Sequence, residues 1–357
     1  MKDDYLWDGS GEPDPEIQKL EKVLGRYRHA LPAPSFEQVV DIRSAKIRSR
    51  CLNFRLSFAF GAIAAALLVA ISMYLFLRPP TFDEKLGPAW DVARLEGAPR
   101  VGSKAIRGNA GVGKLGVGQT LVTDDSSRAA ITFDETGRVE VDQSSRLRLV
   151  TNGPGHSRLS LERGTIRATI WAPPGEFVVD TPSAVAVDLG CVYTLHVDDS
   201  GAGLLRTTMG WVGFKLGGRE SFIPAGAVCA TRPKIGPGTP YFEDSTPAFR
   251  DALSRFDFGE NTPAERGKLL GIILVDARKS DALTLWHVLS RVSDADRPRV
   301  YDRLAALAPP PTGVTREGIL RLDRQMLDSW WNSLGYGDVG LWRTYEHDWS
   351  QRPQSAK

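Results

Sequence analysis

The sequence predicts a mixed chain of separate domains: a single transmembrane helix, an all-β domain of short strands arranged as a solenoid or sandwich, and an α-helical domain. Three observations support this prediction. Residues 56–77 carry no charge, short alternating apolar runs fill residues 95–231, and proline-capped amphipathic segments fill residues 245–335. A proline- and glycine-rich joint separates the β part from the helical part. Whether the helices form their own domain or pack on the β sheet stays open from the sequence.

The overall composition limits the classes of function. The chain has 357 residues, a hydrophobic fraction of 42% and a formal net charge of +2. This length allows two or three domains with ordinary cores. The small net charge, and the lack of basic blocks interleaved with aromatic residues, argue against a nucleic-acid partner.

The uncharged stretch runs from Leu56 to Leu77. At about 1.5 Å per residue, a helix of this length extends roughly 33 Å, which is enough to cross a hydrocarbon core of about 30 Å. A buried core helix seldom needs so long a run without a polar side. A cleaved signal sequence would begin near Met1, where this chain is polar. We therefore expect one membrane crossing.

The residues on either side of this span predict its orientation. A basic juxtamembrane segment, residues 43–55, precedes the span, whereas the residues after it mix both signs of charge. Because lysine and arginine resist translocation, we expect a cytoplasmic N-terminus and a C-terminal bulk outside. The residues that set this topology are Arg43, Lys46, Arg48, Arg50 and Arg55.

Residues 1–42 form the expected cytoplasmic helical segment. A helix should begin at Asp14-Pro15-Glu16, because aspartate caps free amides, proline suits the first turn and acid suits the helix dipole. This helix is too short to be stable alone and carries one apolar face, so it needs a partner. Aromatic residues ahead of it suit a partner's groove, with self-packing in a helical hairpin as the alternative. The candidate partner-binding residues are Tyr5, Leu6, Trp7, Ile17, Leu20 and Leu24.

Many short strands are expected in residues 95–231. The apolar residues alternate, and glycine, proline, asparagine or aspartate bounds each run. Short strands at regular spacing indicate an all-β sandwich, barrel or solenoid. The expected strands are 129–133, 139–141, 147–149, 159–161, 165–171, 177–179, 191–197 and 211–216.

The order of several motifs in this region resembles the FecR domain, the periplasmic part of ferric-citrate-regulator-type anti-sigma proteins. The motifs are the strand pair 128–133 and 139–141, Leu-Ser-Leu-Glu-Arg-Gly at 159–164, Phe-Val-Val-Asp-Thr-Pro at 177–182, Leu-Gly-Cys-Val-Tyr-Thr-Leu at 189–195, Gly-Trp-Val at 210–212 and Ile-Pro-Ala-Gly at 223–226. The resemblance covers over a third of the chain, and the preceding single span matches the family's topology. It implies a bacterial inner-membrane protein with a periplasmic β domain and a cytoplasmic sigma-factor partner.

Two of the cysteines bear on this resemblance. Family members often carry threonine where this chain has Cys191, and Cys229 comes shortly after the Ile-Pro-Ala-Gly motif. Both fall on the expected outer side, where an oxidising compartment favours disulfides. We consider a disulfide between Cys191 and Cys229, with two separately buried thiols on strands as the alternative.

Residues 245–335 predict an α-helical domain, and residues 336–357 a tail. Thr246 and Thr262 each precede a proline in an expected first turn, and Thr262 with Glu265 makes a capping box. Further helices are expected near 283–290, 300–307 and 317–334, the last one ending at Gly335. Short helices with short joints suggest a helical-hairpin array, although no strict repeat is present. Ferric-citrate regulators carry a different, transporter-facing module at this end, so the resemblance does not extend to a transporter partner.

Two nucleotide-binding signatures overlap between Gly108 and Gly116, but we do not expect a nucleotide site. The phosphate-loop spacing ends in Lys114-Leu115, without the serine or threonine that holds magnesium. A strand-like segment follows where both signatures need a helix. The five histidines lie far apart and no Gly-x-Ser-x-Gly motif occurs. We therefore expect no enzyme, no cofactor and no metal site, although carboxylates brought together by the fold stay open as a catalytic pair.

Three functional hypotheses follow. The first is a signalling regulator of the anti-sigma type, whose outer β domain senses an envelope signal and whose inner segment binds a sigma factor or another cytoplasmic regulator. The alternative is a membrane-anchored structural module that binds an envelope protein or glycan and has no sigma partner. An exported hydrolase would need a cleft with convergent carboxylates.

Overall fold

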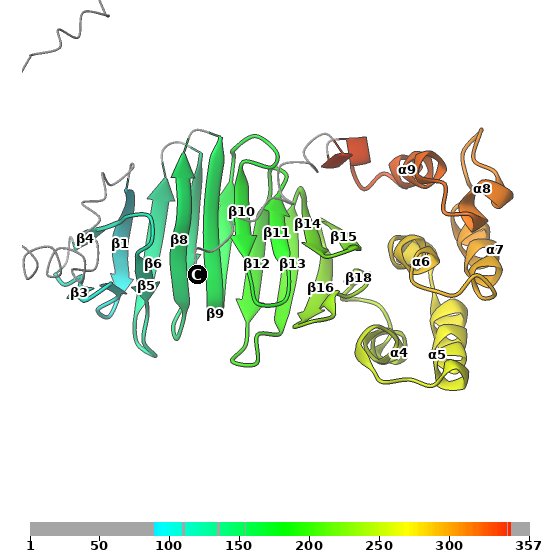
Figure 1. Ribbon diagram of the computed structural model, residues 1–357, viewed down its shortest axis with the longest axis horizontal. Coiled ribbons are helices and arrows are strands. Elements are labelled where there is room, and N and C mark those ends of the chain that lie inside the picture. Colours follow the sequence, from blue (N-terminus) through cyan, green and yellow to red (C-terminus); the bar gives the residue numbers. More distant parts are fainter. Residues whose placement is uncertain (1–88, 109–110, 134–135, 154, 341, 344–357) are drawn as a thin grey trace, which may run out of the picture. The chain divides into compact units, whose positions relative to one another are not determined.

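Figure 1 shows the computed structural model, which describes residues 89–108, 111–133, 136–153, 155–340 and 342–343. These residues belong to one compact unit, Thr81–Lys357. The expected membrane span at 56–77, and the segments 1–42 and 43–55 before it, lie outside the described residues. Within the described ranges, no helix is both long and apolar enough to span a bilayer.

Strands between Trp90 and Phe242 form two sheets that are joined through one long strand, β9 (His156–Ile170). The first sheet has the order β4 (Val112–Leu115), β1 (Trp90–Glu96), β6 (Arg128–Phe133), β7 (Gly137–Val141), the C-terminal half of β9, β12 (Val192–Val197), β13 (Gly203–Met209) and β16 (Ala227–Arg232), with β17 (Gly236–Pro237) and β18 (Tyr241–Phe242) beside β16. The second sheet has the order β3 (Lys104–Ala105), β2 (Arg100–Val101), β5 (Thr120–Val122), β8 (Arg146–Gly153), the N-terminal half of β9, β10 (Phe177–Asp180), β11 (Val185–Asp188), β14 (Trp211–Leu216) and β15 (Arg219–Pro224).

Strand β9 passes from one sheet to the other at Gly164. Its residues up to Arg163 pair with β8, and its residues from Gly164 pair with β12. Gly164 has a φ of +98°, and a Cβ atom there would lie 2.1 Å from the hydroxyl oxygen of Ser145. Only glycine fits both the backbone conformation and the space. The bend lets one strand contribute to both sheets.

The strands follow the alternation that the sequence predicts. In β8, Leu147 and Leu149 are fully buried, whereas Arg146 and Arg148, which alternate with them, are exposed. Apolar residues with this pattern from both sheets form one hydrophobic cluster. The expected strand 211–216 coincides with β14, whereas the expected strand 159–161 and all but the last residue of the expected strand 165–171 are parts of the single strand β9.

The C-terminal part of the chain is helical, as expected. Its helices are α4 (Pro247–Phe258), α5 (Pro263–Asp276), the 3₁₀ helix η3 (Lys279–Asp281), α6 (Ala282–Leu289), α7 (Arg297–Leu307), α8 (Arg316–Leu320) and α9 (Arg324–Ser333). Thr246 caps α4, and both hydrogen bonds of the predicted Thr262–Glu265 capping box are present in α5. The sequence therefore predicted the starts of these two helices correctly.

One expectation about the helices is wrong. The expected long helix 317–334 is split into α8 and α9, because Leu322 adopts a φ of +58° and the carboxylate of Asp323 accepts the Met326 amide to start a new helix. The helices do not have a core of their own. Their buried residues belong to the same hydrophobic cluster as the strands.

The region of the two nucleotide signatures is a strand. Val112–Leu115 forms β4, which pairs antiparallel with β1 at the edge of the first sheet. The described part of both signatures therefore does not place amides at a helix start, as phosphate binding at such a motif requires.

Candidate functional site

The candidate partner-binding residues and the residues that set the expected topology all lie outside the described ranges. These are Tyr5, Leu6, Trp7, Ile17, Leu20 and Leu24, with Arg43, Lys46, Arg48, Arg50 and Arg55. The structure describes two of the residues singled out in the sequence, Cys191 and Cys229, and it reveals polar clusters that the sequence did not predict.

The disulfide that we considered is not formed, because Cys191 and Cys229 are free, buried thiols. Cys229 lies in β16 opposite Leu205 of β13, which lies opposite Leu195 of β12. Cys191 is four residues from Leu195 along the chain. Two strand spacings and four residue steps put the two cysteines on the order of 16 Å apart, whereas a disulfide needs Cα atoms about 4.4–6.8 Å apart. The alternative of two separately buried thiols is the observed one.

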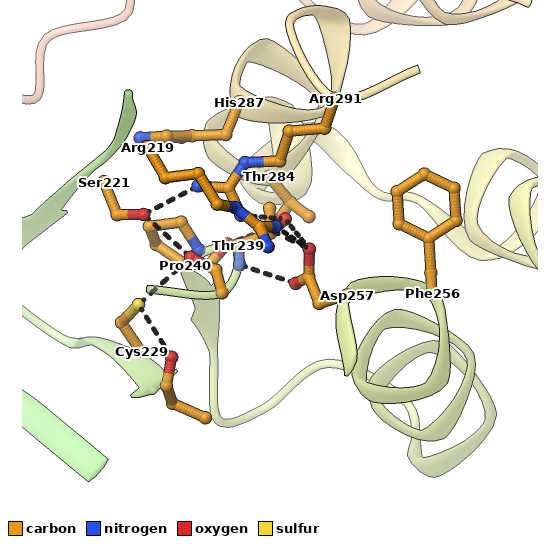
Figure 2. Close-up of polar contacts among 12 residues, drawn as sticks. Arg219, Ser221, Cys229, Thr239, Pro240, Phe256, Asp257, Thr284, His287 and Arg291 are labelled. Carbon is orange, nitrogen blue, oxygen red and sulfur yellow. Dashed lines mark hydrogen bonds and ion pairs between the residues drawn. The ribbon is translucent and has the colours of Figure 1, made fainter. Parts of the chain in front are cut away.

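A buried polar cluster joins the β15–β18 region to helices α4 and α6 (Figure 2). Asp257 of α4 accepts hydrogen bonds from the Thr239 amide at 2.6 Å and the Thr239 hydroxyl at 3.0 Å. Arg291, just after α6, donates to the Ser221 hydroxyl at 2.7 Å and the Glu220 carbonyl at 2.9 Å. We call Arg219, Ser221, Thr239, Asp257 and Arg291 the junction cluster.

Asp257 and Arg291 of the junction cluster hold their charges away from water, whereas Arg219 is partly exposed. The Asp257 side chain is 2% exposed and forms ion pairs with Arg219 at 3.1 Å and Arg291 at 3.3 Å. Burial lowers the pKa of Arg291, while the charge of Asp257 opposes this effect. Removing one member of such a buried group leaves charge without compensation, which costs far more than breaking a surface ion pair. The cluster therefore fixes the position of the helices against the sheet.

His287 of α6 makes a second polar contact across this junction. Its Nε2 accepts the Phe222 amide at 3.0 Å, and its Nδ1 lies 2.8 Å from the Leu283 carbonyl oxygen. Since a carbonyl only accepts, Nδ1 carries the proton and the ring is neutral. Burial, together with the charge of Arg291, lowers the pKa of His287 from 6.5 to about 3. The imidazole is therefore a structural connector and not a proton carrier at neutral pH.

Aromatic rings surround Phe222 of β15. The rings of Trp211, Trp286, Trp331 and Trp342 lie between 5.1 and 6.0 Å from it, centroid to centroid. Such tilted and edge-on contacts add to the stabilisation from burial. These rings come from β14, α6, α9 and the segment after α9, so one side chain connects four parts of the chain.

Residues 336–340 and 342–343, at the start of the segment that we expected as a tail, pack on the sheet. Trp342 is fully buried, and a Cβ atom on Gly213 of β14 would lie 1.7 Å from its ring. Arg343 forms ion pairs with Asp328 of α9 and Glu220 of β15, both at 3.1 Å. The missing side chain at Gly213 therefore makes the space in which Trp342 lies.

A further buried cluster, made of Asp188, Cys191 and Tyr193, lies within the sheets. Asp188 at the end of β11 is 2% exposed, and its carboxylate accepts hydrogen bonds from the Gly190 amide at 2.7 Å and from the Cys191 thiol. Burial raises the pKa of Asp188 to about 7, against the effect of these two hydrogen bonds. Burial, together with the charge of Asp188, raises the pKa of the Cys191 thiol and of Tyr193. These three groups therefore stay protonated to a higher pH than usual.

A polar cavity of about 520 Å³ lies between the turns β5–β6, β7–β8 and β12–β13 and the bend of β9. Hydrogen bonds from the Ser127 hydroxyl and from the amide and hydroxyl of Ser126 lower the pKa of Asp124, and those from the hydroxyl and amide of Ser200 lower the pKa of Asp198. Asp199 forms an ion pair with Arg163 at 3.4 Å. Each of these carboxylates is engaged in its own turn or ion pair, and within the described residues no group of three or more His, Cys, Asp or Glu side chains could hold a metal ion.

Two large apolar side chains are exposed near the ends of β9 and β13, the two strands that flank β12. Trp171, directly after β9, is 68% exposed, and Met209 at the end of β13 is 64% exposed. Val192 of β12 lies between Met209 and Thr169, and Trp171 follows Thr169 by two residues. We call Trp171, Val192 and Met209 the exposed apolar patch.

A comparison of the sequence with known protein families gives a match over the strands that carry Asp188, the polar cavity and the exposed apolar patch. Residues 119–209, from β5 to β13, match the family described as FecR protein. We refer to these matched residues as the FecR domain. No curated protein matches the chain. The FecR domain includes Asp188, Cys191, the polar cavity and the exposed apolar patch, whereas the junction cluster lies C-terminal to it.

Two solved structures are similar to part of the chain. Both are described as a "putative anti-sigma factor" from Parabacteroides distasonis ATCC 8503, at 1.65 and 2.50 Å resolution. Each is 14% identical, with a TM-score of 0.31. The similarity covers 35% of this chain and 60% of the first, and 37% of this chain and 63% of the second. The chain therefore spans less than two thirds of the length of these structures.

Sequence reasoning missed the junction cluster around the end of the FecR-type sheet. Asp257 carried a signal, because it lies four residues after Leu253 and next to Phe256, on the buried face of α4. A carboxylate on an apolar helix face indicates a buried partner. Arg219 and Arg291 carried no such signal, since nothing in the spacing relates them to Asp257.

Proposed function

We propose that this chain is a single-pass membrane signalling regulator of the anti-sigma type. The observation that carries the proposal is the match of residues 119–209 to the FecR family. In this proposal the FecR domain receives an envelope signal, and residues 1–42 bind a sigma factor or another cytoplasmic regulator. The role requires no catalysis, and the chain acts by binding.

The connection between sheet and helices supports a sensing role for the whole described part. The junction cluster, His287 and the rings around Phe222 tie the C-terminal helices to β14 and β15. A ligand that shifts one of these strands would therefore shift the helices as well, because packed interfaces of this kind respond as units.

We also propose the location. The uncharged stretch 56–77 would cross the bacterial inner membrane once, with residues 1–55 inside and the FecR domain in the periplasm. The basic residues before the stretch support this orientation. A reporter enzyme fused after Lys357 should be active in its periplasmic form, and activity in the cytoplasmic form would overturn the orientation.

Co-purification tests the sigma partner. The full-length chain in a mild detergent is mixed at micromolar concentration with each sigma factor of the source cell, and we expect one of them to bind. Trp7→Ala and Leu20→Ala should weaken this binding, since aromatic and aliphatic anchors dominate such interfaces. Trp171→Ala, outside residues 1–42, is the matched control and should not. Failure of all sigma factors to bind would reject the proposal.

A second candidate function is a membrane-anchored module that binds an envelope glycan or protein without a sigma partner. The exposed apolar patch favours it, because a tryptophan that is 68% exposed beside an exposed methionine is typical of a binding surface. Sedimentation of the full-length chain with purified peptidoglycan is the test. Binding that Trp171→Ala removes, together with no sigma-factor binding, would favour this function over the first.

A further inference from the structure

The carboxylate of Asp188 is unusual among the buried carboxylates of this protein. Asp257 and Asp281 are equally buried, and each forms an ion pair with an arginine. Asp188 is 2% exposed, and no cation among the described residues pairs with it. Its hydrogen-bond donors are the Gly190 amide, the Cys191 thiol and the Cys191 amide, and all three are uncharged. A buried carboxylate without a cation has a strong tendency to take up a proton.

The thiol of Cys191 suits a site that changes its protonation state. A thiol donates its proton to an ionised carboxylate, and its sulfur accepts the proton of a neutral carboxyl group, so the pair keeps a hydrogen bond in both states. A thiol is a weaker donor than a hydroxyl, so it stabilises the ionised carboxylate less. Burial raises the pKa of this thiol, and it therefore keeps its own proton while Asp188 titrates.

The groups around Asp188 add no other charge. Cys191 and Tyr193, at the start of β12, are the titratable groups that face it. On β14 the residue opposite Asp188 is Val212, and in the 173–176 turn the Gly175 amide binds the Asp188 carbonyl. Glu176 of that turn lies toward Gly155.

We propose that Asp188 and Cys191 form a proton-responsive switch, which holds the turn between β11 and β12 closed in acid and loosens it toward neutral pH. The turn joins the two sheets of the FecR domain, since β11 belongs to one and β12 to the other. It also touches the β13–β14 turn, because the Gly190 carbonyl packs directly against Gly210. This inference goes beyond the proposed function and does not depend on a sigma partner.

The pH range of this switch follows from the difference between the pKa of Asp188 in the closed turn and its ordinary pKa. The closed form holds Asp188 with a pKa of about 7, and the ordinary value is 3.8. A raised pKa means that the stabilisation is complete below 3.8 and is lost as the pH rises through about 7. The equilibrium constant for opening the turn should then rise about 50-fold between pH 5 and pH 7, and less than about twofold between pH 7 and pH 8.

Hydrogen–deuterium exchange of the full-length chain tests this switch. The readout is the protection factor of peptides covering residues 189–193, with the intrinsic pH dependence of exchange removed. In the natural chain the factor should fall about 50-fold from pH 5 to pH 7. In Asp188→Asn it should not change with pH, while Asp199→Asn, which removes an exposed carboxylate, should behave like the natural chain. A constant protection factor in the natural chain would overturn the proposal.

A series at Cys191 provides a second test that does not need Asp188→Asn to fold. Cys191→Ser replaces the weak donor by a stronger one, which stabilises the ionised carboxylate and should move the loss of protection to lower pH. Cys191→Ala removes the donor and should move it to higher pH. The opposite order, or the same midpoint for all three chains, would contradict the role of the thiol.

Discussion

At the scale of single residues, His287 makes stability depend on pH in the direction opposite to Asp188. Its pKa is lowered to about 3 in the folded chain, against 6.5 ordinarily. Between these values the unfolded chain binds a proton that the folded chain does not. The free energy of unfolding should therefore fall by up to about 1.4 kcal/mol for each pH unit below 6.5.

His287→Gln isolates this effect. The variant lacks the imidazole, so the difference in unfolding free energy between it and the natural chain should narrow as the pH falls from 7 to 5. Urea denaturation of both chains at pH 7, 6 and 5 measures the difference, and the pH response of Asp188 cancels because both chains share it. His196→Gln, which removes an exposed imidazole, is the control. A difference that stays constant would show that His287 takes up a proton equally readily in the folded and the unfolded chain.

Asp257 is the counter-charge of the buried Arg291 and of the partly exposed Arg219, so its removal should be costly. Asp257→Asn would leave Arg219 and Arg291 without their counter-charge, at a cost of about 3–5 kcal/mol. Asp251→Asn, six residues earlier in α4, removes an exposed ion pair with Arg255 and should cost less than about 1 kcal/mol. Urea denaturation at pH 7 compares the two. Equal effects would mean that the junction cluster carries no special stability.

At the scale of single elements, the bend of β9 determines how the two sheets are joined. Gly164→Ala would place a methyl group against Ser145 in a backbone conformation that favours glycine, and should cost about 3 kcal/mol or more. Gly153→Ala in β8 meets no atom within 4 Å and should change stability by less than about 1 kcal/mol. Thermal denaturation followed by circular dichroism distinguishes the two outcomes. A small effect at Gly164 would show that β9 can bend elsewhere.

The elements that the sequence predicted well are those with local signals. The capped starts of α4 and α5 and the strand β14 have such signals in threonine, proline and alternating apolar residues. The break at Leu322 has none, because the preceding residues continue a helical pattern and only the tertiary fold selects the positive φ. The same holds for the candidate site. Cys191 could be singled out, but its partner Asp188 is buried by strands that come later in the sequence.

At the scale of the whole described part, the sheets and the helices should unfold together. Phe222 contacts rings from β14, α6, α9 and the segment that follows, and all of them belong to one hydrophobic cluster. Loss of the contact between the sheets and the helices would expose apolar residues of both, so neither part would keep a complete core. A single cooperative transition follows from this arrangement.

Phe222→Ala tests this cooperativity. Removing the ring should cost about 3–5 kcal/mol, because the four tryptophan rings around it would lose a common contact. Helix and strand signals in circular dichroism should still disappear at one urea concentration, lower than in the natural chain. Trp171→Ala, which removes an exposed ring of similar size, should leave the midpoint nearly unchanged. If the helix signal of Phe222→Ala were lost before the strand signal, the helices would be a separate unit, and a shift in β15 could not be passed through them as a rigid body.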